Sequence, residues 1–129
     1  YGVFHAGTRR LRYATGGHPA ALLFAPGADT AAPTKLGIPA LPIGVMDDTE
    51  YPVGEIDIAP GSRLYVYSDG VYEVRFTDGR EMTLEDFIPL VATAPPASPG
   101  LISVRTAVAD LQGKSQFDDD FSLLELVFD

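Results

Sequence analysis

The first half of the chain alternates short apolar runs with turn residues, a pattern typical of antiparallel strands. It predicts strands at residues 1–4, 9–15, 20–24, 51–58 and 63–67, and a later run predicts another at 121–128. Residues 25–35 are rich in Ala, Pro and Gly, so a loop is expected there. Residues 38–45 should be extended, but Pro39 and Pro42 exclude them from the centre of a sheet.

After Arg75 the apolar residues follow a helical period instead. One stripe consists of Leu84, Phe87, Ile88 and Val91, and a second consists of Leu101, Val104, Val108 and Leu111. Thr83 is the expected N-cap of the first helix, and Pro89 is expected to kink it. The second helix should begin at the pair Ser98-Pro99, with Ser98 as N-cap, and end at Gly113. The fold class expected from this order is α+β.

Composition limits the class of protein. The 129 residues suffice for a single domain, and 46% of them are hydrophobic, so the chain should fold. The net charge of −9 argues against nucleic acid or an anionic membrane as partner. The absence of cysteine excludes disulfides and thiolate metal sites. No apolar stretch is long enough for a membrane span, so a cytoplasmic protein is expected.

Two aspartates lie where two predicted strands should meet. The run at 63–67 stops at Ser68-Asp69-Gly70, and Asp118-Asp119-Asp120 precedes the run at 121–128. If these runs pair as antiparallel neighbours, Asp69 and Asp119 share one end of a sheet. Crowded carboxylates repel unless a positive charge lies between them, and Mg²⁺ and Mn²⁺ prefer oxygen ligands. The sequence therefore predicts a divalent metal site and indicates a metal-dependent enzyme.

Three other motifs have simpler interpretations. Gly16-Gly17-His18-Pro19 predicts a tight turn in which His18 hydrogen-bonds nearby backbone. Residues 47–50 predict an acidic surface turn. Arg9, Arg10 and Arg12 form a small basic face that is interpreted as solvated, with phosphate binding as the alternative. No phosphate-binding glycine loop and no serine nucleophile elbow is present.

The motifs also have a recognisable order. They are Tyr13-Ala14-Thr15-Gly16-Gly17-His18-Pro19, Leu41-Pro42-Ile43-Gly44, Pro60-Gly61, Tyr67-Ser68-Asp69-Gly70-Val71-Tyr72-Glu73 and Asp119-Asp120-Phe121-Ser122. Over nearly the whole chain this order resembles the bacterial SpoIIE-like branch of the PPM (type 2C) metal-dependent serine/threonine protein phosphatases.

The resemblance implies part of an αββα sandwich, in which two mostly antiparallel sheets are flanked by helices. It implies two Mn²⁺ or Mg²⁺ ions at one end of the sheets, with Asp69 as the bridging ligand and Asp119 as a second ligand. Gly70 would let the backbone turn close to the metal, Asp120 would assist through water, and His18 would serve the turn or support the ligands.

The resemblance further implies hydrolysis of phosphoserine or phosphothreonine in bacterial signalling. The substrate would be a phosphorylated regulatory protein, such as an anti-sigma-factor antagonist, and a sensor or receiver domain would lie upstream in the parent protein. No further catalytic group is expected, because water between the two ions acts as the nucleophile.

One departure from the family leaves alternatives open. The family domain has an N-terminal half with a Gly-Gly-Asp-like metal motif, so residues 1–129 are expected to be the C-terminal portion that lacks it. This piece alone should then be inactive, with an incomplete or absent metal site. One alternative is a truncated, non-catalytic relative that acts as a protein-binding module, and another is an unrelated β-rich interaction domain. Uncovered sheet edges would also favour homo-oligomers.

Overall fold

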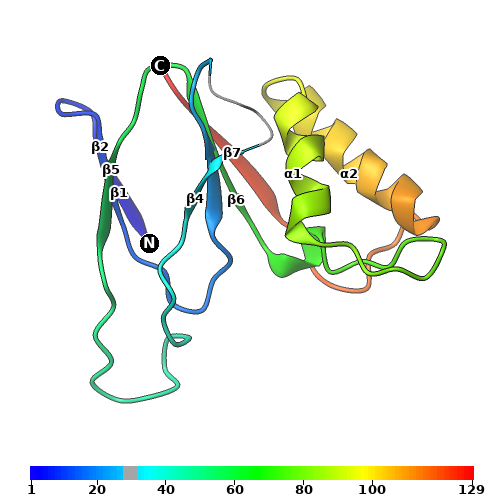
Figure 1. Cartoon of the computed structure of the whole chain (residues 1–129), viewed down its shortest axis with the longest axis horizontal. Coiled ribbons are helices and arrows are strands. Elements are labelled where there is room, and N and C mark those ends of the chain that lie inside the picture. The colour runs from blue at the N-terminus through cyan, green and yellow to red at the C-terminus, as the bar shows by residue number, and fades with distance from the viewer. Residues whose placement is uncertain (28–31) are drawn as a thin grey trace.

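The computed structural model describes residues 1–27 and 32–129, which form two antiparallel sheets and two helices (Figure 1). The first sheet has the order β1-β2-β5 and the second the order β4-β3-β6-β7. The strands are β1 (Gly2–His5), β2 (Arg10–Tyr13), β3 (Ala21–Phe24), β4 (Thr34–Leu36), β5 (Gly54–Asp57), β6 (Ser62–Tyr67) and β7 (Leu123–Phe128). The helices are α1 (Leu84–Thr93) and α2 (Ser98–Gln112), and a short 3₁₀ helix η1 (Asp69–Val71) follows β6. The expected α+β class is confirmed.

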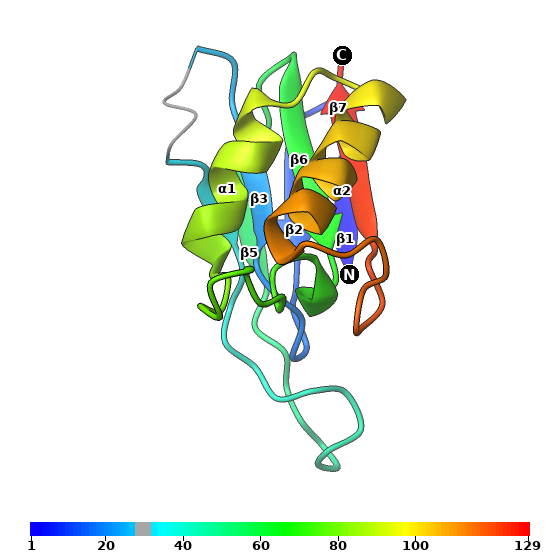
Figure 2. The same cartoon turned by 90° about the vertical axis from the view of Figure 1, so that its right-hand side faces the viewer.

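The elements form three layers, with the four-stranded sheet in the middle (Figures 1 and 2). One core lies between the two sheets and includes Leu11, Leu36 and Leu64. A larger core lies between the middle sheet and the helices and includes Tyr67, Phe87 and Val108. Because alternate residues of a strand point to opposite faces, β6 supplies side chains to both cores.

The predicted strands are found, with one correction in the loop expected at residues 25–35. Residues 34–36 form β4, which pairs with β3 through Leu36 opposite Ala21. Leu36 is 3% exposed, so burial against the first sheet favours this short strand although the sequence around it is typical of a loop. Residues 28–31 of the expected loop lie outside the described residues.

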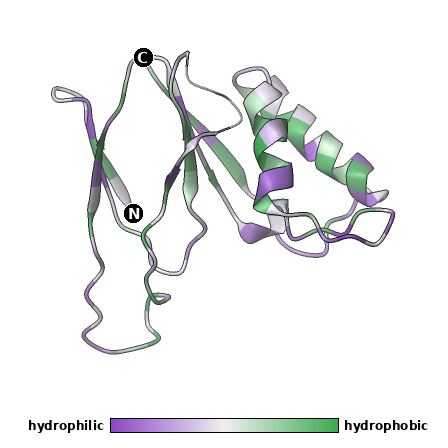
Figure 3. Cartoon of the chain, in the orientation of Figure 1, coloured by the Kyte–Doolittle hydropathy of each residue, from purple (hydrophilic) through white to green (hydrophobic). Residues whose placement is uncertain are grey.

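Helix α1 begins where the sequence predicts. Thr83 and Asp86 form a capping box, in which the Thr83 hydroxyl accepts from the Asp86 N–H and the Asp86 carboxylate accepts from the Thr83 N–H. Pro89 lies inside this helix, and the kink expected there stays a prediction. Figure 3 shows α1 as largely hydrophobic, with a hydrophilic band in its first turn, where Glu85 and Asp86 lie.

Helix α2 departs from the prediction at both ends. Its N-cap is Ala97, with a φ of 65°, and Ser98 is already helical, so the expected Ser98 cap is wrong by one residue. At the other end Leu111 is 37% exposed, and Gln112 is buried in its place. The Gln112 side chain donates to the carbonyls of Lys114 and Gln116, so it closes the loop that leads to β7. Gly113 ends the helix as expected.

A buried polar network attaches the helix layer to the middle sheet. The Glu125 side chain is 3% exposed, and Arg63 Nε donates to it over 2.6 Å. Glu125 also accepts from the Tyr65 hydroxyl and from the Ala97 N–H, while Arg63 donates to the Ala94 carbonyl. The network therefore joins β6 and β7 to the connection between α1 and α2.

Two strand edges are open on the same side of the molecule, those of β1 and β7 (Figure 2). Val3 on β1 is 46% exposed, and Leu124 and Leu126 on β7 are 55% and 39% exposed. Leu126 is opposite Leu64 in the ladder and lies on the face that points toward the first sheet. Within the part of the chain that is described, no helix is long and apolar enough to cross a membrane.

Candidate metal site and adjoining groove

The pairing of β6 with β7 brings the two aspartate-bearing loops to one end of the middle sheet. The two strands are antiparallel, with Tyr67 opposite Leu123. The ladder continues by one bond beyond the strands, from the Ser68 N–H to the Ser122 carbonyl at 3.1 Å. Chain direction in an antiparallel pair therefore places the loop after β6 beside the loop before β7.

Gly70 marks the point where these loops touch. A Cβ atom at this position would lie 2.6 Å from the Asp120 carbonyl oxygen and 3.3 Å from the Asp119 Cβ. The first distance is shorter than real Cβ contacts, and the neighbour is backbone, so a larger residue would push the loops apart. The structure thus brings together Asp69, Gly70, Asp119 and Asp120, as the expected strand pairing implies.

Ser68 also belongs to this site, although no role was predicted for it from the sequence. Its hydroxyl donates to the Asp120 carbonyl at 2.6 Å and accepts from the Ser122 N–H at 3.0 Å. These bonds hold the loop before β7 against the end of β6. A small hydroxyl residue directly before Asp-Gly at a strand end was the available signal, but its partners lie more than fifty residues away along the chain.

Asp69 and Asp119 are both exposed, and each makes a similar local hydrogen bond. Asp69 Oδ1 accepts from the N–H of Gly70 at 3.1 Å, and Asp119 Oδ1 accepts from the N–H of Asp120 at 2.7 Å. Among the described residues neither aspartate takes part in an ion pair, whereas their neighbour Asp118 is paired with Lys114 at 2.7 Å. Their negative charge therefore lacks a protein partner within the described chain.

This donor set fits part of a divalent metal site. Carboxylate oxygens on two touching loops suit hard cations such as Mg²⁺ and Mn²⁺. Over residues 1–27 and 32–129, however, there is no group of three or more His, Cys, Asp or Glu side chains that could hold a metal ion. Two carboxylates leave most positions of a six-coordinate ion to water or to other protein groups. The metal roles of Asp69 and Asp119 thus stay predictions.

His18 lies on a separate loop, between β2 and β3. Its Nδ1 donates to the Pro19 carbonyl at 2.9 Å, which is the local backbone bond predicted for it. The preceding glycines have a different role from a simple turn. A Cβ at Gly16 would lie 2.8 Å from the Ile43 side chain, and one at Gly17, whose φ is +73°, would lie 2.6 Å from Pro42. The Gly-Gly and Leu-Pro-Ile-Gly motifs therefore pack on each other.

The basic face of the first hairpin has acidic partners on β5. Arg10 pairs with Asp57 at 3.1 Å, and Arg12 pairs with Glu55 at 2.9 Å. Arg9 instead donates to the backbone carbonyls of Ile58 and Asp129. This arrangement favours a solvated face over a phosphate site for Arg10 and Arg12, which are exposed, whereas Arg9 is partly buried.

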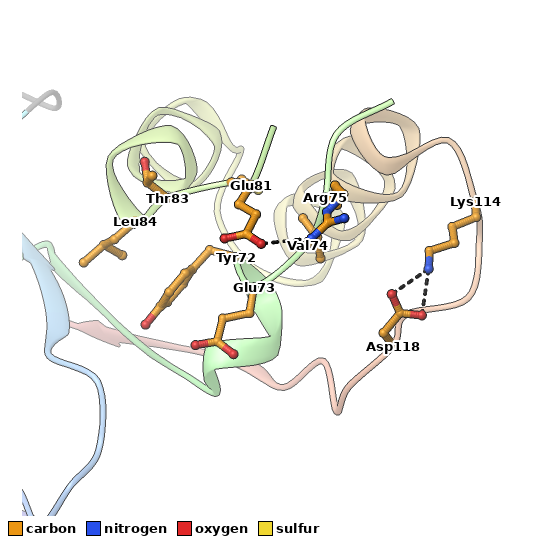
Figure 4. A pocket seen from close by; sticks show the side chains of 10 residues that line it. Tyr72, Glu73, Val74, Arg75, Glu81, Thr83, Leu84, Lys114 and Asp118 are labelled. Atoms are coloured by element: carbon orange, nitrogen blue, oxygen red, sulfur yellow. Dashed lines mark hydrogen bonds and ion pairs between the residues drawn. The ribbon is translucent and has the colours of Figure 1, made fainter. Parts of the chain in front are cut away.

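A groove of about 860 Å³ adjoins the two loops (Figure 4). Its lining comes from the segment after η1, from the start of α1 and from the loop between α2 and β7. Tyr72 extends along one wall, and its partial burial, together with the nearby charges of Glu73 and Asp69, raises the pKa of its phenol. The phenol therefore stays protonated at neutral pH and can donate a hydrogen bond.

Comparisons with known proteins agree on one family. The family model described as Stage II sporulation protein E (SpoIIE) matches residues 1–129. A crystal structure of the RsbU and RsbW domains of Rv1364c from Mycobacterium tuberculosis is similar, with 25% identity, a TM-score of 0.69, and coverage of 96% of this chain and 34% of that chain. The comparison with curated protein sequences gives no match.

Two further solved structures share the fold at lower identity. The SiaA-PP2C domain of Pseudomonas aeruginosa is 19% identical, with a TM-score of 0.72 and coverage of 95% of this chain and 48% of that one. The Mn-presoaked phosphatase domain of SpoIIE from Bacillus subtilis is 13% identical, with a TM-score of 0.71 and coverage of 100% and 55%. The chain thus spans between 34% and 55% of the length of these three solved chains. Because the family model matches residues 1–129, the whole of this chain, the chain belongs to the SpoIIE family.

Proposed function

We propose that residues 1–129 form part of a phosphatase domain that hydrolyses phosphoserine or phosphothreonine on a regulatory protein. The observation that carries this proposal is the contact at Gly70, which joins the loops of Asp69 and Asp119 at one end of a SpoIIE-family fold. Family membership supports the reaction class, and the exposed carboxylates, which form no ion pair among the described residues, are suitable ligands for divalent cations.

In this proposal Asp69 and Asp119 hold the divalent cations, and Gly70 keeps the two loops in contact. Asp120 orients water nearby, and Ser68 fixes the backbone on which Asp119 and Asp120 lie. When bound, Mn²⁺ or Mg²⁺ activates water and neutralises charge on the phosphoryl oxygens. The described residues supply only two of the ligands for a two-ion site, so other ligands must complete it.

The substrate side of the proposal is a phosphorylated regulatory protein, such as an anti-sigma-factor antagonist. The similar M. tuberculosis structure contains RsbU and RsbW domains in one protein, which supports a setting in regulation. We also propose that a sensor or receiver domain controls the parent protein and that residues 1–129 alone are inactive. A cytoplasmic location belongs to this same proposal.

The test of this function compares the two candidate ligands with an exposed aspartate elsewhere on the surface. Asp69→Asn and Asp119→Asn should each lower Mn²⁺-dependent hydrolysis of a phosphoserine peptide by more than about 100-fold, because losing a ligand exceeds the 10–100-fold effect of altering groups behind it. The assay uses the protein with any sequence that flanks residues 1–129 in its natural form. Asp47→Asn is the control, since Asp47 is exposed on a loop outside the groove and is not a candidate ligand. Equal activity in all three variants would refute the metal roles.

A protein-binding module without catalysis is the second candidate, favoured by the open edge of β7 with its exposed Leu124 and Leu126. Such an edge offers unpaired backbone groups beside apolar side chains to another chain or to a second copy. Light scattering of residues 1–129 should show self-association that Leu124→Lys reduces. A stable monomer at high concentration would count against a binding role for this edge. Metal-dependent hydrolysis by the natural protein would show that the module is catalytic after all.

A further inference from the structure

The groove of about 860 Å³ beside the candidate metal site takes no part in the proposed metal chemistry. Its floor is apolar, with Val74 6% and Met82 5% exposed. Its rim carries charged side chains from three segments of the chain, as Figure 4 shows. Its volume of about 860 Å³ falls within the roughly 300–1,000 Å³ typical of ligand sites, so it can take several residues of an extended polypeptide.

Residues that line the groove lie close to both candidate metal ligands along the chain. The N–H groups of Tyr72 and Glu73, which line it, donate to the Asp69 carbonyl at 3.0 and 2.9 Å. Asp118, at the other wall, directly precedes Asp119. A polypeptide whose phosphorylated side chain reaches Asp69 and Asp119 would therefore place its adjoining residues in this groove.

The charges in the groove are unequal in their pairing. Arg75 is paired with Glu81 at 3.0 Å, and Lys114 is paired with Asp118 at 2.7 Å. Glu73 is exposed and, within the described residues, takes part in no ion pair. In Figure 4 its side chain points away from both pairs. Glu73 is thus the groove carboxylate that can accept a cation without breaking an existing pair.

We propose that this groove binds the polypeptide next to the phosphorylated residue of the substrate, and that a Lys or Arg of that polypeptide pairs with Glu73. The inference rests on the proposed function and adds a substrate preference to it: a basic side chain close to the phosphorylated residue. Glu73 is here a specificity-determining residue that contacts the substrate away from the reacting phosphate.

The experiment uses binding, so that it does not depend on catalysis. Fluorescent serine peptides that differ only in a neighbouring Lys, Ala or Glu are titrated into the ¹⁵N-labelled protein with any sequence that flanks residues 1–129 in its natural form. The Lys peptide should bind best and should shift amide signals at Tyr72, Glu73 and Thr83. Glu73→Gln should weaken binding of the Lys peptide about two- to fivefold, the range for one exposed ion pair, and should leave the Ala peptide unchanged. Glu73→Lys should reverse the preference toward the Glu peptide.

The control is Glu50→Gln, which removes an exposed carboxylate from a loop outside the groove and should not change the preference. No binding of any peptide, shifts confined to other surfaces, or the same Lys preference in Glu73→Gln would each overturn the inference. Those results leave the effect of Asp69→Asn on hydrolysis untouched. Groove binding that persists while Asp69→Asn retains full activity would instead refute the metal proposal.

Discussion

The carboxylate of Glu125 and those of Asp69 and Asp119 have opposite environments in the same molecule. Glu125 is 3% exposed and accepts hydrogen bonds from Arg63, Tyr65 and the Ala97 N–H. Burial acts to raise the pKa of Glu125, but these donors outweigh it and hold the pKa below its ordinary value. Asp69 and Asp119 are exposed and accept only from the N–H of the next residue.

The difference separates a charge that the protein itself pairs from two charges that form no ion pair among the described residues. The protein supplies every partner of Glu125, so that charge fixes the helix layer on the middle sheet. It supplies no cation to Asp69 or Asp119 among the described residues, although Gly70 brings their loops into contact. Exposed carboxylates on two touching loops, with no counter-charge among the described residues, are suitable ligands for a divalent cation.

The largest effect on folding is expected from Glu125→Ala. It leaves the partly buried Arg63 without its acceptor, and removing one partner of a buried pair costs about 3–5 kcal/mol. Glu55→Ala is the matched control, because Glu55 pairs with Arg10 and Arg12 on the exposed hairpin, where a pair contributes about 0–1 kcal/mol. Urea unfolding measures both free energies. Equal losses would mean that the network does not anchor the helices.

The next effect concerns the contact that holds the two loops together. Gly70→Ala should lower the free energy of unfolding by about 1–3 kcal/mol, since its Cβ would meet the Asp120 backbone. It should also weaken Mn²⁺ binding by moving Asp119 away from Asp69. Gly2→Ala is the control, because a Cβ there makes only ordinary contacts, at 3.5 Å from Leu11. Thermal unfolding and calorimetric Mn²⁺ titration would contradict the prediction if both variants behaved alike.

Acid should weaken the network around Glu125 and spare the loop contact. Because the folded-state pKa of Glu125 lies below its unfolded value, the unfolded chain takes up the proton first as pH falls. The stabilisation is therefore complete above the unfolded pKa of about 4.3 and is lost as pH falls through the folded value. Unfolding free energies of wild type and Glu125→Gln between pH 7 and pH 3 should converge. If the difference between the two free energies stayed constant over this pH range, protonation of Glu125 would not be the cause of the acid destabilisation.

The smallest effect on folding should come from Asp69→Asn and Asp119→Asn. Without metal, each should change the free energy of unfolding by less than about 0.5 kcal/mol, because the side chains are exposed and the substitution removes like-charge repulsion. With Mn²⁺ added to the protein in its natural form, including any flanking sequence, wild type should melt at a higher temperature and the variants should not. A destabilisation comparable to that of Glu125→Ala would show that these aspartates are structural.

Much of this arrangement is readable from local pattern. Thr83 as helix cap follows from its position before an amphipathic stripe. The loops of Asp69 and Asp119 meet because one follows an apolar strand and the other precedes one, provided that the two strands pair as antiparallel neighbours. The hydrogen bond of His18 to Pro19 is likewise local. In each case the decisive interaction is between residues near each other in the sequence, or between the ends of two strands.

Other predictions were wrong, and some features were missed, because interactions between residues far apart in the sequence decide them. Residues 34–36 form a strand through pairing with β3, against a local composition typical of a loop. Gln112 takes the buried position predicted for Leu111, since its amide closes the following loop. Ser68 and Glu125 depend on partners on other elements.

The sequence by itself determined the α+β class, every described strand except β4, both helices and the two candidate metal ligands, because periodicity, helix caps and strand direction are local properties. The tertiary structure decided which carboxylates have protein partners, where the groove lies beside Asp69, and which strand edges stay open. The physical reason is that burial and counter-charges come from segments far apart along the chain, and only the packed sheets and helices bring those segments together.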